Sequence, residues 1–122
     1  PAFGTCAGAI LLAREVLNPA QRSLGLIDIT VERNSYGRQV DSFETFGSFH
    51  PVAGAERQIE MVFIRAPRIR RLGEGVQPLA ECGGDTVVAR QGRVLVATFH
   101  PELGAGEDVH GYFLQMVEDA RG

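Results

Sequence analysis

The sequence predicts a single α/β domain in which helices occupy the two ends of the chain and strands lie between them. Three observations support this prediction: helical apolar spacing near each terminus, period-two apolar patterns in the interior, and a hairpin signal at Gln91-Gly92. A length of 122 residues suits one domain, and 44% apolar with 22% charged residues is typical of a globular protein. The sequence shows no internal repeat and no linker, so we expect one folded unit.

The first elements are a helix and a strand. The segment AGAILLAREVL predicts a helix over residues 7–17, because its apolar residues recur at helical spacing. The Asn-Pro pair that follows ends this helix, since a proline disfavours helical backbone in the residue before it. The next segment, LGLIDITVERN at residues 24–34, alternates isoleucine and valine with polar residues, which predicts a strand.

The middle of the chain predicts further strands. Residues 38–49 and 59–67 each read as a strand, separated by a polar, glycine-containing segment at residues 50–58. Residues 85–102 carry the clearest hairpin, with two β-branched runs around a Gln-Gly turn. The basic cluster RAPRIRR, residues 65–71, is interpreted as a solvated rim of the domain.

The last element is a helix that covers the sheet. Asp108 is a suitable N-cap residue for it, because a carboxylate can accept the free amides of the first turn. One apolar stripe at helical spacing follows, formed by Val109, Tyr112, Phe113, Met116, Val117 and Ala120. This stripe predicts that one face of the helix packs on the sheet.

Composition excludes several classes of function. The formal charge is −3, from 15 acidic and 12 basic residues, so the chain lacks the basic excess that nucleic-acid binding needs. No segment approaches the roughly 20 apolar residues of a membrane span, and the N-terminus lacks a signal-peptide pattern. We therefore expect a cytoplasmic protein without a nucleic-acid or membrane partner. Its two cysteines, Cys6 and Cys82, lack zinc-site spacing and are expected to be free thiols, with no metal.

Cys6 lies in the segment GTCAG, which has the form of a strand-to-helix elbow with cysteine in place of serine. Gly4 and Gly8 leave room where the strand and helix would pack closest. The amides at the start of the helix favour negative charge, which predicts a lowered thiol pKa, and the Ala7 amide could face an oxyanion. The same segment also fits a buried cysteine at a tight turn.

A thiolate nucleophile needs a proton carrier, and His100 is the best candidate. It ends an apolar strand, and Glu102 follows two residues later behind the stiff Pro101, as the orienting carboxylate of a triad would. His50 has no carboxylate after it and is interpreted as a surface loop residue, and His110 as a solvated helix residue. Cys6, His100 and Glu102 together predict acyl transfer through a thioester.

These motifs resemble those of the class I, triad-type glutamine amidotransferases, in which a Gly-x-Cys-x-Gly elbow is followed by a later His-Pro-Glu. The segments ERNSYGRQVDSFE, VFIRAPRI and SFHPEL resemble, more narrowly, the glutaminase subunits of pyridoxal 5'-phosphate synthase. The resemblance extends over nearly the whole chain. It implies a three-layer α/β/α, flavodoxin-like domain that lacks its N-terminal strands, with residues 1–122 as the C-terminal portion of a single amidotransferase domain.

The resemblance also implies an activity and a site. Members of the family hydrolyse L-glutamine to L-glutamate and ammonia, without a cofactor, and deliver the ammonia to a synthase subunit that makes pyridoxal 5'-phosphate, vitamin B6. By resemblance, Cys6 is the nucleophile, His100 the general base and acid, and Glu102 its orienter. The contacts to glutamine carry over onto three further residues, Arg33, Ile64 and Arg65.

One departure from the family concerns the oxyanion site. The family has a Gly-Gly-Glu-Ser type loop upstream of the elbow, and nothing in this sequence matches it. If these 122 residues were the entire polypeptide, we would expect weak or absent glutaminase activity, because losing one oxyanion donor costs about 100- to 1000-fold in rate. Two other interpretations stay open at this point: a thiol hydrolase or peptidase of related fold, and a non-catalytic regulatory domain.

Overall fold

The computed structural model describes residues 1–33, 42–52, 55–104 and 106–121. Within these residues the chain forms two sheets, which we call the large sheet and the small sheet. The large sheet has the strand order β1-β9-β8-β7-β4-β5, with bounds β1 (Ala2–Thr5), β9 (Val94–Ala97), β8 (Asp85–Gln91), β7 (Gln77–Cys82), β4 (Ser42–Val52) and β5 (Ala55–Ile64). The small sheet has the order β2-β3-β6, with bounds β2 (Ala13–Leu17), β3 (Ile27–Glu32) and β6 (Arg68–Leu72).

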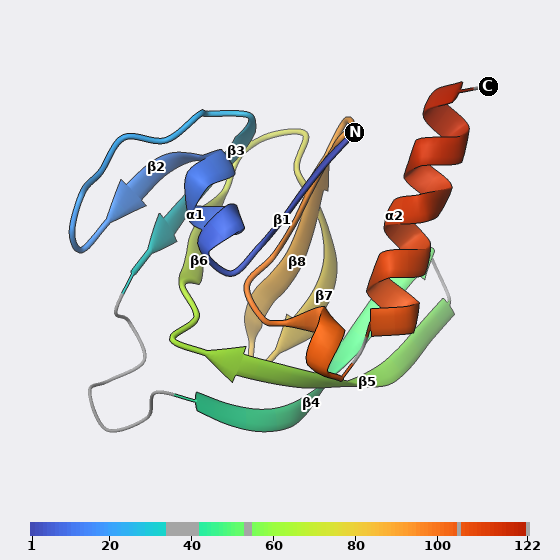
Figure 1. The fold of residues 1–122 in the computed structure, drawn as a ribbon. Helices are drawn as coiled ribbons and strands as arrows, with labels where there is room; N and C mark the ends of the chain where they lie inside the picture. Colours follow the sequence, from blue (N-terminus) through green and yellow to red (C-terminus); the bar gives the residue numbers. More distant parts are fainter. Residues whose placement is uncertain (34–41, 53–54, 105, 122) are drawn as a thin grey trace.

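Helices cover both faces of the large sheet, so the domain has three layers (Figure 1). Helix α2 (Gly106–Arg121) lies on one face, and α1 (Ala7–Leu12) lies with the small sheet on the other. Two apolar clusters match this division, one containing Val109 and Met116 of α2, the other Ala9 and Leu12 of α1. The predicted α/β architecture with a helix at each end is confirmed.

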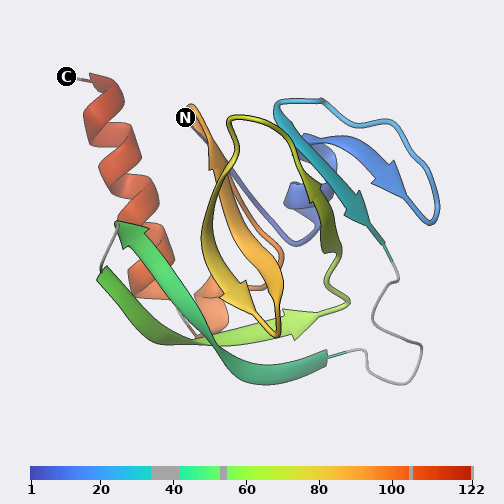
Figure 2. The ribbon, with the colours of Figure 1, turned by 180° about the vertical axis from the view of Figure 1, so that it is seen from behind.

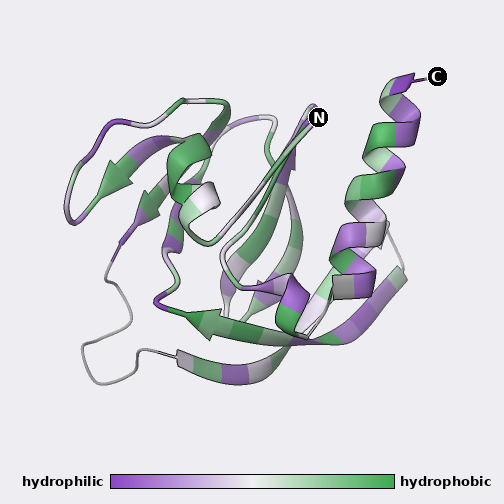
Figure 3. Cartoon of the chain, in the orientation of Figure 1, coloured by the Kyte–Doolittle hydropathy of each residue, from purple (hydrophilic) through white to green (hydrophobic). Residues whose placement is uncertain are grey.

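Helix α2 packs on the large sheet through the predicted apolar stripe. Val109 and Met116 are buried at 0% and 3% exposure, and Tyr112 and Phe113 pack against the same cluster. Figure 3 shows apolar and polar bands alternating along this helix, as expected for one buried face. The helix begins at Gly106, so the expected N-cap Asp108 is wrong: its carboxylate lies in the first turn and pairs with Arg57 at 2.7 Å.

The first helix is shorter than predicted. It ends at Leu12, because Ala13 turns to extended backbone at φ −64° and ψ 155°, and residues 13–17 form β2 instead. Parallel pairing of β2 with β3 gives these residues a hydrogen-bonding partner that a sequence pattern cannot show. Val16 is buried there, so the apolar residues assigned to a helical face serve a strand.

The described residues contain more strands than predicted, with different bounds. The polar segment at residues 50–58 lies partly within β4 and β5, whose ladder pairs Phe49 with Arg57. Backbone hydrogen bonds hold this exposed hairpin together, so it does not need an apolar pattern. Part of the basic cluster forms β6, in which Arg68, Arg70 and Arg71 make ion pairs while Arg70 and Arg71 stay exposed, as expected for a solvated rim. The hairpin β8–β9 is confirmed, turning at Gly92 with φ +59°.

The large sheet curls so that its two edges meet. Strand β5 is at the opposite edge from β1, yet the backbone amide of His100 donates to the carbonyl of Val62 in β5 at 2.8 Å. Figure 1 shows β5 crossing beneath the lower ends of the central strands, and Figure 2 shows the same crossing from behind. The end of β5 therefore lies against the segments that follow β1 and β9.

Candidate active site

Cys6 lies at the sharp turn between β1 and α1. Its backbone has φ 53° and ψ −107°, a conformation that costs a non-glycine residue on the order of 1–3 kcal/mol. The surrounding structure holds it there, since its amide donates to the carbonyl of Ala97 at 2.8 Å and its carbonyl accepts from Ala9 at 3.0 Å. The strained turn presents the thiol beyond the end of the strand, as a nucleophile elbow does.

The two glycines of the elbow have different surroundings. A Cβ at Gly4 would lie 2.6 Å from the carbonyl carbon and oxygen of Gly8, whereas a Cβ at Gly8 would meet nothing within 4 Å. The expectation that both glycines provide close packing is therefore right for Gly4 and wrong for Gly8. A side chain at Gly8 would meet no neighbouring atom, so glycine is not needed there for the strand and the helix to pack closely.

This asymmetry predicts opposite effects of two matched substitutions. Gly4→Ala is expected to destabilise the domain by about 1–3 kcal/mol, because the backbone of Gly8 cannot move aside easily. Gly8→Ala is expected to be neutral or to stabilise by up to about 1 kcal/mol, because alanine is the better helix former. Chemical denaturation of the two variants measures both effects, and equal destabilisation by the two would contradict the elbow geometry.

The thiol of Cys6 is half-buried and in contact with the end of β5. Its Sγ donates to the carbonyl of Ile64 at 3.4 Å. Burial raises the pKa of the Cys6 thiol, the amide of Ala7 lowers it and the charge of Glu102 raises it, so that the net pKa is above its ordinary value. The predicted lowering of this pKa by the helix is wrong for the resting site, because desolvation outweighs the amides of a six-residue helix.

A raised thiol pKa has a measurable consequence. At neutral pH less of Cys6 is thiolate than in a free cysteine, so its alkylation by iodoacetamide should be slower than that of the free amino acid. The rate should rise about tenfold per pH unit between pH 7 and 8.5 without a plateau. A Cys82→Ser background removes the second thiol, and a plateau near neutral pH would show that the resting thiol is already ionised.

His100 and Glu102 form the second part of the site. His100 follows the end of β9 and directly precedes η1, a single 3-10 turn (Pro101–Leu103). Its Nδ1 lies 2.9 Å from Glu102 Oε2. Burial raises the pKa of Glu102, but the hydrogen bond from His100, a backbone amide and the charges of His100 and His110 outweigh it and leave the pKa below its ordinary value. The carboxylate is therefore ionised and oriented at the imidazole.

The structure brings Cys6, His100 and Glu102 to one end of the large sheet. Strands β1 and β9 are parallel neighbours paired at Thr5 and Ala97, so the residues that follow them leave the sheet at the same edge. The end of β5 contacts both segments, through the carbonyl of Ile64 at Cys6 and that of Val62 at His100. Glu102 is close enough to the thiol for its charge to raise the thiol pKa.

The expected substrate-binding residues occupy two places. Ile64 lies against the thiol, and the exposed Arg65 follows it with φ +46°, a left-handed conformation that is unusual for a side chain of this size. Arg33 follows β3, and its guanidinium donates to Gln21 Oε1. Ala7, the expected oxyanion donor, is exposed next to Cys6. Ile64 and Arg65 thus adjoin the triad, and Arg33 belongs to the small sheet.

Sequence reasoning misjudged the surroundings of the other two histidines. His110, interpreted as solvated, is half-buried, packs edge-on against Phe3 with ring centroids 5.8 Å apart, and contributes to the low pKa of Glu102. His50 lies in β4, not in a loop, and has a carboxylate partner, Glu81, at 3.6 Å. Both partnerships join distant parts of the chain, so no local pattern indicates them.

Within residues 1–33, 42–52, 55–104 and 106–121, no group of three or more His, Cys, Asp or Glu side chains is arranged to hold a metal ion. In the same residues no helix has the length and apolar character needed to cross a membrane.

A thiol on a strained elbow beside a histidine–carboxylate pair, in a three-layer α/β domain, is the arrangement of the triad-type, thiol-dependent amidotransferase class. Comparison with known families agrees, since the SNO glutamine amidotransferase family matches residues 1–119. The chain belongs to the SNO glutamine amidotransferase family.

Curated relatives are similar over nearly all of this chain. The pyridoxal 5'-phosphate synthase subunit PdxT of Koribacter versatilis is 54% identical over 119 residues, which are 98% of this chain and 60% of that protein. The corresponding subunit of Thermosipho africanus is 54% identical over 118 residues, 97% of this chain and 61% of that protein. The chain therefore spans about 60% of the length of these relatives.

Solved structures support the fold. One, described as a glutamine amidotransferase, has a TM-score of 0.79 at 52% identity and covers 93% of this chain and 59% of its own. Another, described as a putative GMP synthase component from Thermoplasma acidophilum, has a TM-score of 0.66 at 16% identity, covering 99% of this chain and 59% of its own. The predicted amidotransferase-like, flavodoxin-like fold class is confirmed by these two neighbours.

Proposed function

We propose that the protein hydrolyses L-glutamine to L-glutamate and ammonia through a cysteinyl thioester. The observation that supports the proposal is that the Cys6 thiol and the hydrogen-bonded pair of His100 and Glu102 both lie at one end of the large sheet. Membership of a glutamine amidotransferase family supports glutamine as the substrate.

The chemistry follows from the placement of the protons. Because Nδ1 of His100 is held by Glu102, Nε2 is the nitrogen that exchanges protons with the substrate and the thiol. His100 takes the proton of Cys6 as the sulfur attacks the carboxamide carbon, and the amide of Ala7 donates to the resulting oxyanion. His100 then protonates the leaving nitrogen, the C–N bond breaks, and ammonia departs from the thioester.

Hydrolysis of the thioester completes the cycle. His100 takes a proton from a water molecule as its oxygen attacks the thioester carbon, and the proton passes to the sulfur as glutamate leaves. The raised pKa of the resting thiol makes this base necessary, because little thiolate forms without it at neutral pH. The charge on Glu102 stabilises the imidazolium formed in each half of the cycle.

Recognition of glutamine is assigned to Ile64 and Arg65 beside the triad and to Arg33 of the small sheet. The carbonyl of Ile64 contacts the thiol, Arg65 follows Ile64 in the chain, and Arg33 directly follows β3. A guanidinium can hold the α-carboxylate of glutamine with two parallel hydrogen bonds. In this proposal the arginines fix the amino-acid end of the substrate and leave its carboxamide at Cys6.

The ammonia acceptor is proposed to be a synthase subunit that makes pyridoxal 5'-phosphate. The relatives named as PdxT are subunits of such a synthase, and they are about half identical to this chain. Delivery within a complex would keep ammonia from being lost to water as ammonium. The protein would then act in vitamin B6 formation, as the glutamine-hydrolysing member of a two-component enzyme.

A glutamate-release assay tests the proposal. The intact protein is incubated with L-glutamine, with and without the synthase subunit, and glutamate is quantified. Release that increases when the synthase is added would indicate that the partner completes the site. No release in either condition would contradict the function, and a thiol ester or peptide cleaved in place of glutamine would indicate a thiol hydrolase.

A further inference from the structure

The proposed site is built from two sheets, and their relative position decides whether it can work. This inference rests on the proposed function. Arg33 follows β3 at the end where Glu32 pairs with Arg68 of β6, so it belongs to the small sheet. Cys6 and His100 follow β1 and β9 of the large sheet. Glutamine bound by Arg33 and attacked by Cys6 therefore spans both sheets.

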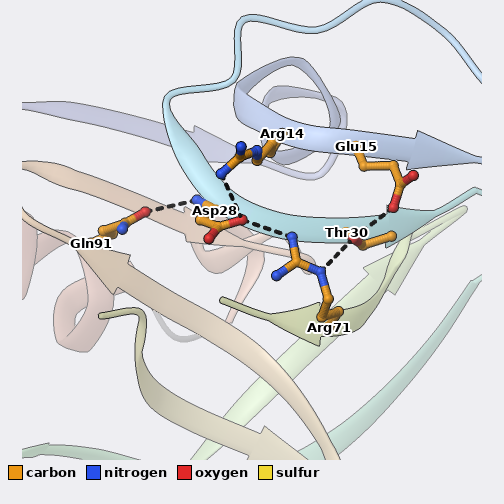
Figure 4. Close-up of polar contacts among 6 residues, drawn as sticks. All are labelled: Arg14, Glu15, Asp28, Thr30, Arg71 and Gln91. Carbon is orange, nitrogen blue, oxygen red and sulfur yellow. Dashed lines mark hydrogen bonds and ion pairs between the residues drawn. The ribbon is translucent and has the colours of Figure 1, made fainter. Parts of the chain in front are cut away.

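The opposite ends of the two sheets are joined by a polar cluster (Figure 4). We call it the Asp28 joint, and its members are Arg14, Glu15, Asp28, Thr30, Arg71 and Gln91. Asp28, near the start of β3, accepts from Arg71 at 2.7 Å and pairs with Arg14 at 3.6 Å. These contacts link β2, β3 and β6 of the small sheet at this end.

Gln91 connects the small sheet to the large one. It ends β8, close to the first residue of β9, and its Oε1 accepts the backbone amide of Asp28 at 2.7 Å. On the other side, Gly73 donates its amide to the carbonyl of Asp28 at 2.7 Å, and a Cβ at Gly73 would lie 2.0 Å from Asp28 Oδ2. The backbone of Asp28 is thus held twice, once from each sheet.

The apolar contacts between the two sheets do not fix their relative orientation as a hydrogen bond does. Ile27 and Ile29 of the small sheet pack in one cluster with Ala89 and Val96 of the large sheet. Apolar burial holds the sheets together but is not directional, so it tolerates sliding better than a hydrogen bond of fixed length does. Asp28 is near the start of β3 and Arg33 directly follows its end. A small change in the angle between the two sheets at Asp28 would therefore move Arg33 relative to Cys6.

We infer that the hydrogen bond between Gln91 and Asp28 sets the distance from the glutamine-binding end of the small sheet to the catalytic end of the large sheet. Gln91 and Asp28 are then positioning residues, which act on the substrate through Arg33. Two arginines lie beside the Asp28 carboxylate, and the hydrogen bond from Arg71 holds the pKa of Asp28 below its ordinary value.

The test is Gln91→Leu in the intact protein with its synthase partner. The substitution removes the acceptor but keeps most of the side-chain volume. We expect KM for glutamine to rise about five- to tenfold, kcat to change less than twofold, and alkylation of Cys6 by iodoacetamide to be unchanged, since misplaced binding groups weaken the substrate complex. Gln91→Glu retains an acceptor oxygen and is expected to restore KM to within twofold of the wild type.

The matched control is Gln58→Leu. This substitution also removes a side-chain hydrogen bond, the one that Gln58 donates to Ser48 at 2.8 Å. Because both residues lie within the large sheet, KM for glutamine should not change. An unchanged KM in Gln91→Leu, or an equal rise in Gln58→Leu, would overturn the inference while leaving the proposed function intact. Absence of glutamate release from the wild type would overturn the proposed function, and the inference with it.

Discussion

Replacing Cys6 by alanine is expected to reduce glutamate release by about 10⁴-fold or more, because in the proposed mechanism the thioester forms on the sulfur of Cys6. The alanine removes Sγ, which contacts the Ile64 carbonyl, and changes little else at the elbow. The measurement is the steady-state rate of glutamate formation in the presence of the synthase subunit. Denaturant unfolding should show a stability close to that of the wild type, so that the loss can be assigned to chemistry.

Cys82 provides the control for this experiment. It is the second free thiol, its pKa is also raised by burial, and its Sγ lies near the carbonyl of Phe46 in another part of the large sheet. Cys82→Ala should retain full glutamate release. If residual turnover in Cys6→Ala disappeared when Cys82→Ala was added, the assignment of the nucleophile to Cys6 would be wrong.

Replacing His100 by asparagine is expected to reduce kcat by about 10²- to 10⁴-fold, the usual contribution of a general base and acid. The effect should be large here because the thiol is resting in its protonated form and cannot ionise readily without a base. Single-turnover measurements should show both slow formation and slow hydrolysis of the thioester, since His100 acts in each step.

Glu102→Gln tests the orienting role separately. The glutamine can present an amide hydrogen to Nδ1 and so favour the wrong imidazole tautomer, which should lower kcat on the order of 10²-fold. His50→Asn is the matched histidine control, because His50 also has a carboxylate neighbour but lies on β4. A loss in His50→Asn as large as that in His100→Asn would contradict the assignment of the base.

The sequence predicted the fold class and the motifs, because both depend on local patterns. The C-terminal helix follows from its apolar stripe, and the β8–β9 hairpin from two β-branched runs around a glycine turn. The elbow at Cys6 and the His100-Pro101-Glu102 segment are likewise read from short stretches. His100 and Glu102 are two residues apart, so their contact at 2.9 Å needs only a single turn of backbone.

Elements that depend on distant partners were not predicted. The helix expected over residues 7–17 ends early, because β2 finds its partner in β3. Strand β6 is rich in arginine and was not predicted as a strand, because its partner β3 and the ion-pair partners Glu32, Asp28 and Asp85 come from other parts of the chain. In each case a pairing across the chain outweighs the local propensity.

The sequence by itself determined which residues are candidates for the chemistry: a cysteine between glycines, a histidine with a nearby carboxylate, and arginines suited to a carboxylate ligand. Only the tertiary structure decided how they are placed and how they are tuned. The curl of the large sheet brings the end of β5 to Cys6 and His100. Burial raises the thiol pKa against the helix amides, and the Asp28 joint ties the small sheet to the large one. Desolvation and contacts between distant strands arise only when the chain is packed, which is why no local pattern could indicate them.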